Sequence, residues 1–191
     1  MTTVANHEAA PLATDHCQRG REPVIREGGS VEIPLTKGQV ALVSPESYHL
    51  VRAVMWQAFW HPDTRSFYAQ RGTHLNGRRI SYHMHRVVLE AGVPAIQVDH
   101  INHDTLDNRL SNLRLATNAQ NHANLRVRAG SRSGFKGVSW YKRDQNWHAC
   151  ITVAGKNRHL GYFPTAEEAG RAYDRAAREV FGEFACLNAA E

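Results

Sequence analysis

Short stretches in which apolar and polar residues alternate predict several strands in the first half of the chain. Gly, Ser, Pro or Asn residues bound these stretches, and such residues favour turns over continued strand. Asn76-Gly77 separates two of the stretches and is typical of a two-residue hairpin turn. The strands predicted in this region cover residues 31–33, 39–43, 67–69 and 79–82.

Apolar residues spaced three to four apart predict the helices, because that spacing places their side chains on one helical face. Thr117 is a suitable N-cap for the third predicted helix, with Leu125 on its buried side. The fourth begins with Glu167 and Glu168 in its first turn and is followed by Gly182. The predicted helices cover residues 46–56, 83–90, 118–128 and 166–181.

The pattern divides the chain into modules of an α+β protein. Residues 1–30 show no sustained periodicity and are predicted to form a flexible tail. Residues 31–128 hold a strand-rich leader and a polar block, and residues 129–133 have linker composition. Residues 134–188 hold three short strands and one helix, so a three-stranded sheet packed on a helix is expected there. Its predicted strands cover residues 137–142, 147–153 and 158–163.

Composition narrows the class of protein. The chain has 191 residues, 42% hydrophobic and 21% charged, which is an ordinary globular composition. No apolar run approaches the roughly eighteen residues that a membrane span needs, so no membrane partner is expected. The three cysteines, Cys17, Cys150 and Cys186, lie far apart without a Cys-x-x-Cys. This spacing argues against a disulfide framework and against a cysteine zinc site.

The distribution of charge is more informative than its total, a net +5. The segment from Arg114 to Leu160 contains nine Lys and Arg residues and a single acid, Asp144, with Trp, Tyr and His interleaved. Such a segment is typical of a surface that meets phosphates. A solvated basic face is the alternative interpretation.

The candidate chemistry is concentrated around Asp99-His100, which lies in a strand predicted over residues 97–101 and is followed by Asn-rich segments. Carboxylate and amide oxygens are hard ligands that suit Mg²⁺ or Mn²⁺. Adjacent residues of a strand leave opposite faces, so separate roles are predicted for the two side chains. A histidine with a pKa of about 6.5 can take a proton from water at neutral pH. A divalent ion with few protein ligands can stabilise charge on a phosphodiester.

Four segments between about residues 81 and 124 resemble the HNH homing endonucleases of phages and bacteria. They are Met84-His85-Arg86, Val98-Asp99-His100-Ile101-Asn102, Asn108-Arg109-Leu110-Ser111-Asn112-Leu113-Arg114 and Thr117-Asn118-Ala119-Gln120-Asn121. The resemblance implies a ββα-metal module, in which two antiparallel strands and a helix grip one divalent ion, and it implies cleavage of DNA.

The resemblance also implies the roles of single residues. It makes Asp99 and Asn121 the metal ligands, His100 the general base, and Asn112 the residue that orients the histidine and ties its loop. His85, in the predicted helix over residues 83–90, is interpreted as a packed or hydrogen-bonded histidine, with a functional role as the alternative. Arg109 and Arg114 are candidate DNA contacts, with solvated side chains as the alternative.

Residues 133–188 resemble the DNA-binding domain of the plant ethylene-response factors (ERF), of APETALA type. Gly134-Phe135-Lys136-Gly137 and Ala172-Tyr173-Asp174-Arg175-Ala176-Ala177 carry the resemblance. It implies a three-stranded antiparallel sheet that lies on the DNA major groove and is backed by the helix. Strand alternation assigns Trp140 and Trp147 to the core. The side chains of this module predicted to contact DNA are Lys136, Ser139, Tyr141, Lys142, Arg143, His148, Thr152, Lys156, Asn157, Arg158 and His159.

Together these observations predict a metal-dependent DNA endonuclease of homing type, directed by its second module, with one Mg²⁺ or Mn²⁺ ion and no zinc. Double-stranded DNA is the expected partner of a monomer, and nicking is preferred because one site cuts one strand at a time. The expected location is a bacterial cytoplasm, with a bacterial or phage gene. A DNA-binding regulator with an inactive nuclease half is the alternative, and a structural RNA-binding protein would use only the basic segment.

Overall fold

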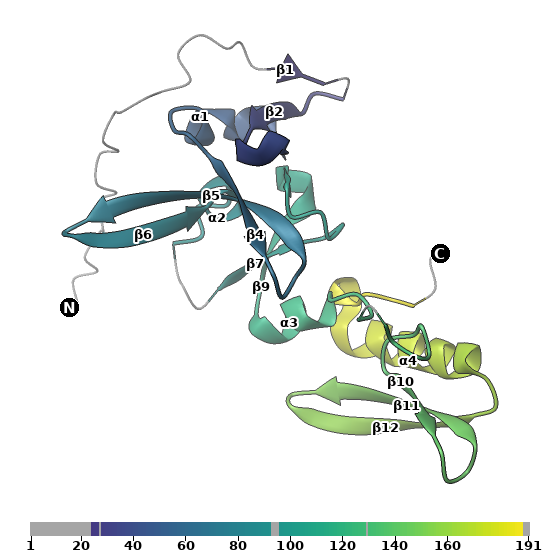
Figure 1. Ribbon diagram of the computed structural model, residues 1–191. Coiled ribbons are helices and arrows are strands. Elements are labelled where there is room, and N and C mark those ends of the chain that lie inside the picture. The colour runs from purple at the N-terminus through teal and green to yellow at the C-terminus, as the bar shows by residue number, and fades with distance from the viewer. Residues whose placement is uncertain (1–23, 27, 93–95, 129, 189–191) are drawn as a thin grey trace, which may run out of the picture. The chain divides into compact units, whose positions relative to one another are not determined.

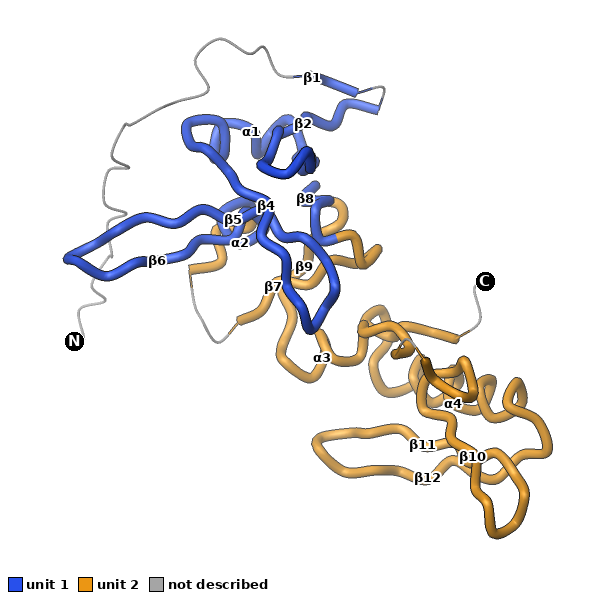
Figure 2. The backbone as a smooth tube through the Cα atoms, viewed as in Figure 1, with its two compact units in different colours: residues 1–88, 105–110 blue, residues 89–104, 111–191 orange. Residues whose placement is uncertain are grey.

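The computed structural model describes residues 24–26, 28–92, 96–128 and 130–188 (Figure 1). These residues form a mixed α+β protein with several small sheets and few helices, which confirms the predicted class. Two compact units are present, residues 1–88 with 105–110 and residues 89–104 with 111–191 (Figure 2). Within the described residues, no helix is long and apolar enough to cross a membrane.

The first unit contains a four-stranded sheet in the order β1-β2-β3-β8. Strands β2 and β3 are antiparallel and bury the alternating apolar side chains of the leader. Strand β8 lies in the polar block, where no strand was predicted, and pairs in parallel with β3. Backbone pairing therefore joins residues 107–108 of the polar block to strand β3 of the leader. The strands are β1 (Val24–Ile25), β2 (Val31–Pro34), β3 (Val40–Val43) and β8 (Asp107–Asn108).

Strand β1 also shortens the expected tail over residues 1–30. Val24 and Ile25 pair with Glu32 and Val31, so this part of the chain is a strand because β2 offers it a free edge. Residues 1–23 lie outside the described residues.

A second sheet of the first unit has the order β4-β5-β6, with β4 (Gln57–His61), β5 (Ser66–Leu75) and β6 (Arg78–His83). The predicted hairpin turn is present, and Asn76 and Gly77 both have positive φ, 49° and 74°. Two successive positive φ values are what a type I′ turn requires. Strand β4 was not predicted, and it pairs along its whole length with β5.

The helices of the first unit are short. The helix predicted over residues 46–56 is wrong in length: a 3₁₀ turn, η2 (Pro45–Ser47), leads into α1 (Tyr48–Val51), which ends there. Trp56 is buried and donates its indole N–H to the Val51 carbonyl at 3.0 Å, which turns the chain out of the helix and leaves Met55 exposed. The others are η1 (Thr36–Gly38) and α2 (Met84–Val88).

The second unit begins with β7 (Gln97–His100) and β9 (Leu113–Ala116), which pair antiparallel and place Asp99 opposite Arg114. The 3₁₀ turn η3 (Leu110–Asn112) precedes β9 and α3 (Asn118–Ala123) follows it. Thr117 caps α3 as predicted, and its capping box is completed by Gln120.

Helix α3 is shorter than the predicted 118–128, and the prediction that Leu125 is buried is wrong. Leu125 is 49% exposed. The helix stops because the side chain of Asn124 turns to Asp99 and to the His100 carbonyl. Beyond it, Arg126 reaches back to the Asn102 carbonyl.

The rest of this unit is an antiparallel sheet of order β10-β11-β12 packed against one helix, α4, as Figure 1 shows. Val138, Ala149 and Ile151 of the sheet form the buried core with small residues and Tyr173 of α4. The elements are β10 (Val138–Tyr141), β11 (Asn146–Val153), β12 (Lys156–Phe163), α4 (Ala166–Phe181) and the 3₁₀ turn η4 (Gly182–Phe184).

Candidate nuclease centre and nucleic-acid interface

Strand β7 holds Asp99 and His100 in the interior of the protein. Their side chains are 5% and 6% exposed, unusually low for polar residues in a chain of this size. As neighbours on a strand they leave opposite faces, so each has its own surroundings. A buried carboxylate is stable only where cations or donors surround it, and those partners define the centre.

The carboxylate of Asp99 has two such partners. The side-chain amide of Asn124, at the end of α3, donates to Oδ1 at 2.9 Å and to Oδ2 at 3.1 Å. Arg114 donates from Nε to Oδ2 at 2.8 Å, and its Nη2 lies 2.8 Å from the same oxygen. These charge-assisted bonds fix the orientation of the carboxylate.

Asn121 does not reach Asp99. Its amide donates to the side-chain oxygen of Gln97, two residues earlier on β7. Asn121 and Asn124 are one helical turn apart and so lie on the same face of α3, each against a different residue of β7. The sequence reasoning missed Asn124, although its spacing of three from Asn121 was a signal that could have found it.

Asn112 ties the loop that follows His100. Its side-chain oxygen accepts the backbone N–H of Asn102 at 2.9 Å, and its carbonyl accepts that of Ile101 at 2.9 Å. The His100 carbonyl itself accepts bonds from Asn124 and from the backbone of His103. The segment that carries His100 is therefore fixed from η3, from the residue that follows α3 and from its own loop.

The donor chemistry of the centre fits one hard divalent cation. Asp99 offers a carboxylate, and the neighbouring Asn124 amide offers an oxygen once its plane turns over. Within the described part of the chain, no group of three or more His, Cys, Asp or Glu side chains is placed to hold an ion. One carboxylate with a neutral amide oxygen would leave most coordination positions of such an ion to water and phosphate.

Three cations predicted to contact DNA have partners inside the protein. Arg114 contacts Asp99, and Arg109 makes two bonds to the buried carboxylate of Asp107, at 2.7 and 2.6 Å. Lys136 donates its ammonium group to the Ala123 carbonyl, and burial lowers the pKa of this lysine.

The open face of the β10-β11-β12 sheet carries an aromatic cluster. His148 and His159 are stacked, with Nε2 of the first 2.8 Å from Nδ1 of the second. Tyr162 lies against both rings and against Tyr141. Burial, and then His159, lower the pKa of His148. The predicted residues of this face come together, and Tyr162 is a member that sequence reasoning missed.

The remaining predicted contacts are distributed around this sheet. Thr152 and Asn157 are hydrogen-bonded partners on the open face. A bulge between Ala149 and Cys150 shifts the register, so that Arg158 and Lys156 pair with Ile151 and Val153, on the side of the helix. The other predicted contacts from β10 and the turn after it, Ser139, Lys142 and Arg143, are exposed.

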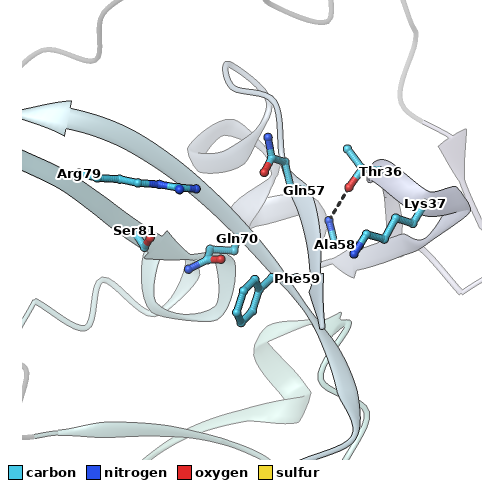
Figure 3. Close-up of a pocket in the computed structure, with 8 residues that line it drawn as sticks. All are labelled: Thr36, Lys37, Gln57, Ala58, Phe59, Gln70, Arg79 and Ser81. Atoms are coloured by element: carbon cyan, nitrogen blue, oxygen red, sulfur yellow. Dashed lines mark hydrogen bonds between the residues drawn. The ribbon is translucent and has the colours of Figure 1, made fainter. Parts of the chain in front are cut away.

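A pocket of about 680 Å³ opens on the β4-β5-β6 sheet of the first unit (Figure 3). Lys37 and Arg79 line it, and the Thr36 hydroxyl accepts the Ala58 N–H at 3.0 Å. None of the predicted site residues lines this pocket. His85 packs elsewhere in this unit, buried, stacked on His83 and edge-on to Tyr68, which agrees with its interpretation as a packed histidine.

Residues 82–123 match the family model described as HNH endonuclease, and residues 133–183 match that of the AP2 domain. An uncharacterized HNH endonuclease of Acanthamoeba polyphaga mimivirus is 31% identical over 153 residues, which are 80% of this chain and 76% of that protein. An AP2-like ethylene-responsive transcription factor of Arabidopsis thaliana is 45% identical over 56 residues, 29% of this chain and 12% of that protein.

A solved structure, described as DNA binding and cleavage by the HNH homing endonuclease I-HmuI, is 20% identical. It covers 76% of this chain and 77% of its own, with a TM-score of 0.31. The two family matches define a nuclease domain joined to an AP2 domain. The chain belongs to the HNH endonuclease family.

Proposed function

We propose that this chain is a metal-dependent DNA endonuclease of homing type, directed to duplex DNA by its AP2 domain. The observation that carries the proposal is the buried Asp99 carboxylate, oriented by Arg114 and Asn124 beside the equally buried His100. Burying two such groups in adjacent positions costs stability, so the arrangement indicates a function rather than a packing requirement.

In the proposed reaction His100 accepts a proton from the attacking water, which a histidine can do near neutral pH. Asp99, with an asparagine of α3, would hold the metal ion. The ion, Mg²⁺ or Mn²⁺, supplies stabilisation of the charge on the phosphate and on the leaving oxygen. Asn112 keeps the His100 loop in place through the bonds to Ile101 and Asn102.

Target selection is assigned to the AP2 domain. Its open sheet face carries His148, His159, Tyr141 and Tyr162, which can contact base edges or stack on the DNA, and exposed cations surround it. A chain with a single centre cuts one strand in each encounter, so a monomer is proposed to nick.

The test is incubation of supercoiled plasmid with the chain in Mg²⁺ or in Mn²⁺. Wild type is compared with His100→Ala, with Asp99→Ala and with His122→Ala, a matched control that removes an exposed histidine of α3. Loss of a general base typically costs about 10²- to 10⁴-fold in rate, so His100→Ala and Asp99→Ala should be strongly impaired and His122→Ala should cut normally. EDTA should stop the wild type.

Equal cutting by all four proteins would overturn the assignment of the centre. Retarded migration of DNA without any cleavage, in both metals, would favour the alternative of a DNA-binding regulator. Sequencing the ends of a cut plasmid library would then give both the target and the strand that is cut.

A further inference from the structure

One side chain joins the nuclease centre to the last turn of the AP2 domain. Arg114, which bonds Asp99 through Nε and Nη2, donates from Nη1 to the Glu183 carbonyl at 2.7 Å. The central carbon of its guanidinium lies 4.0 Å from the centre of the Phe184 ring. Glu183 and Phe184 belong to η4, directly after α4. Arg114 is 13% exposed, so these contacts enclose it.

Further contacts join the end of α3 and the loop after His100 to the AP2 domain; we call this contact region the seam. The backbone N–H of Cys186 donates to the Ala123 carbonyl at 3.2 Å, and the Lys136 ammonium donates to the same oxygen. The Cys186 thiol lies 3.8 Å from Nε2 of His103, in the loop after His100. Ala123 immediately precedes Asn124, so the AP2 domain contacts Arg114, one partner of the Asp99 carboxylate, and the residue next to Asn124, the other partner.

We infer that Arg114 is a positioning residue for Asp99, and that the AP2 domain fixes its guanidinium through Phe184 and the Glu183 carbonyl. The inference rests on the proposed metal-dependent cleavage. A planar guanidinium stacked on a ring and bonded at three nitrogens has a single orientation, and this orientation is passed to the carboxylate. The AP2 domain thereby completes the nuclease centre as well as reading DNA.

The inference predicts opposite effects on metal binding and on rate. Arg114 and a divalent ion compete for the same carboxylate, so loss of the guanidinium should tighten metal binding. The freed carboxylate also loses its orientation, so the rate of cleavage should fall. A change that merely destabilised the fold would weaken metal binding and cleavage together.

The experiment uses the full chain as wild type, Arg114→Met, Phe184→Leu and the double variant. Arg128→Met, which removes an exposed arginine beyond α3, is the matched control for charge. Mn²⁺ affinity is measured by calorimetry in the absence of DNA. The rate of cleavage is measured at saturating Mn²⁺, and DNA affinity is measured by gel shift in EDTA. Thermal melting establishes that each variant is folded, and Phe184→Leu keeps an apolar side chain in the seam.

Arg114→Met should cleave about 10- to 100-fold more slowly, as is usual for a residue that orients a metal ligand, and should bind Mn²⁺ more tightly than wild type. Phe184→Leu should lose about two- to five-fold in rate, the scale of one cation–π contact. The double variant should be no slower than Arg114→Met, because Phe184 acts through Arg114. The DNA affinity of every variant in EDTA should equal that of the wild type. The Arg128→Met control should match the wild type in all three measurements.

Fully multiplicative losses in the double variant, or an unchanged Phe184→Leu protein, would overturn the inference. Weaker Mn²⁺ binding by Arg114→Met would overturn it as well. If the wild type binds Mn²⁺ but does not cleave DNA, the proposed nuclease function is wrong. The Mn²⁺ affinities of the same variants would still test whether Arg114 acts on Asp99. A wild type that binds no Mn²⁺ would end both.

Discussion

Asn124 donates its side-chain amide to both carboxylate oxygens of Asp99, at 2.9 and 3.1 Å. Asn121, which the resemblance to homing endonucleases selects as the metal ligand, bonds Gln97 one helical turn away. Both asparagines lie on the face of α3 that meets β7, so the register of helix against strand decides which of them stands beside the carboxylate.

The two asparagines can be separated by paired substitutions. We expect Asn124→Ala to raise the Mg²⁺ concentration needed for half-maximal cleavage by about 10-fold or more, because it removes the group in contact with Asp99. Asn121→Ala, on the same helix face, should have a smaller effect. Titration of cleavage with Mg²⁺ measures both. A larger effect of Asn121→Ala than of Asn124→Ala would instead identify Asn121 as the metal ligand.

The sequence was sufficient for the elements of the centre but not for its hydrogen bonds. Asp99 and His100 on one strand and the cap at Thr117 follow from local patterns, the antiparallel partner strand is implied by the family resemblance, and each is present. The partners of Asp99 depend on how α3 packs on β7, which no local pattern encodes. Likewise β8 is a pair of polar residues, Asp107 and Asn108, and becomes a strand only because β3 offers an edge.

The AP2 domain should depend strongly on Gly137. A Cβ at this position would lie 2.1 Å from the Tyr173 ring and 2.6 Å from the Cys150 carbonyl, and its φ is +72°. Gly155→Ala is the matched control, since its φ is +76° and a Cβ there meets nothing within 4 Å. We expect Gly155→Ala to cost about 1 kcal/mol of unfolding free energy, from backbone strain alone.

Gly137→Ala should cost about 3 kcal/mol or more, because a steric clash in the core adds to that strain. Urea unfolding of the full chain, followed by tryptophan fluorescence, measures both variants. Equal losses for the two would show that the domain relaxes around Gly137 and that the close approach to Tyr173 is unimportant.

Acid should destabilise the fold through its histidines. Burial is the largest cause of a lowered pKa at His83, His103 and His148. A pKa lowered in the folded state means that, below about pH 6.5, the unfolded chain binds protons that the folded chain resists. The free energy of unfolding should therefore fall as the pH drops through this value, and the melting temperature should decrease from about pH 7.5 to about pH 5.5.

One histidine of this group can be tested with little change to the backbone. His103 has a positive φ of 66°, a conformation that asparagine tolerates well. His103→Asn should make the melting temperature less dependent on pH, whereas His122→Asn, on the exposed side of α3, should leave the dependence unchanged. Identical pH profiles for wild type and His103→Asn would contradict a contribution from this group.

The salt dependence of DNA binding should distinguish the exposed cations of the AP2 domain from Lys136, whose ammonium group is bonded within the protein. If Lys136, Lys142, Arg143, Lys156 and Arg158 all contacted phosphates, the slope of log affinity against log salt would be about −4.5. The ammonium of Lys136 is bonded to the Ala123 carbonyl, and burial lowers the pKa of this lysine. The other four are exposed, so at most four phosphate contacts remain and the slope is no steeper than about −3.6.

Two lysine variants test this difference directly. Lys142→Met should make the slope less steep by about one, because one phosphate contact and its counterion release are lost. Lys136→Met should leave the slope unchanged, since its charge is already engaged with the end of α3. Gel shifts in EDTA over a range of NaCl concentrations measure the slopes without cleavage of the probe. If Lys136→Met and Lys142→Met reduce the slope equally, Lys136 contacts the DNA.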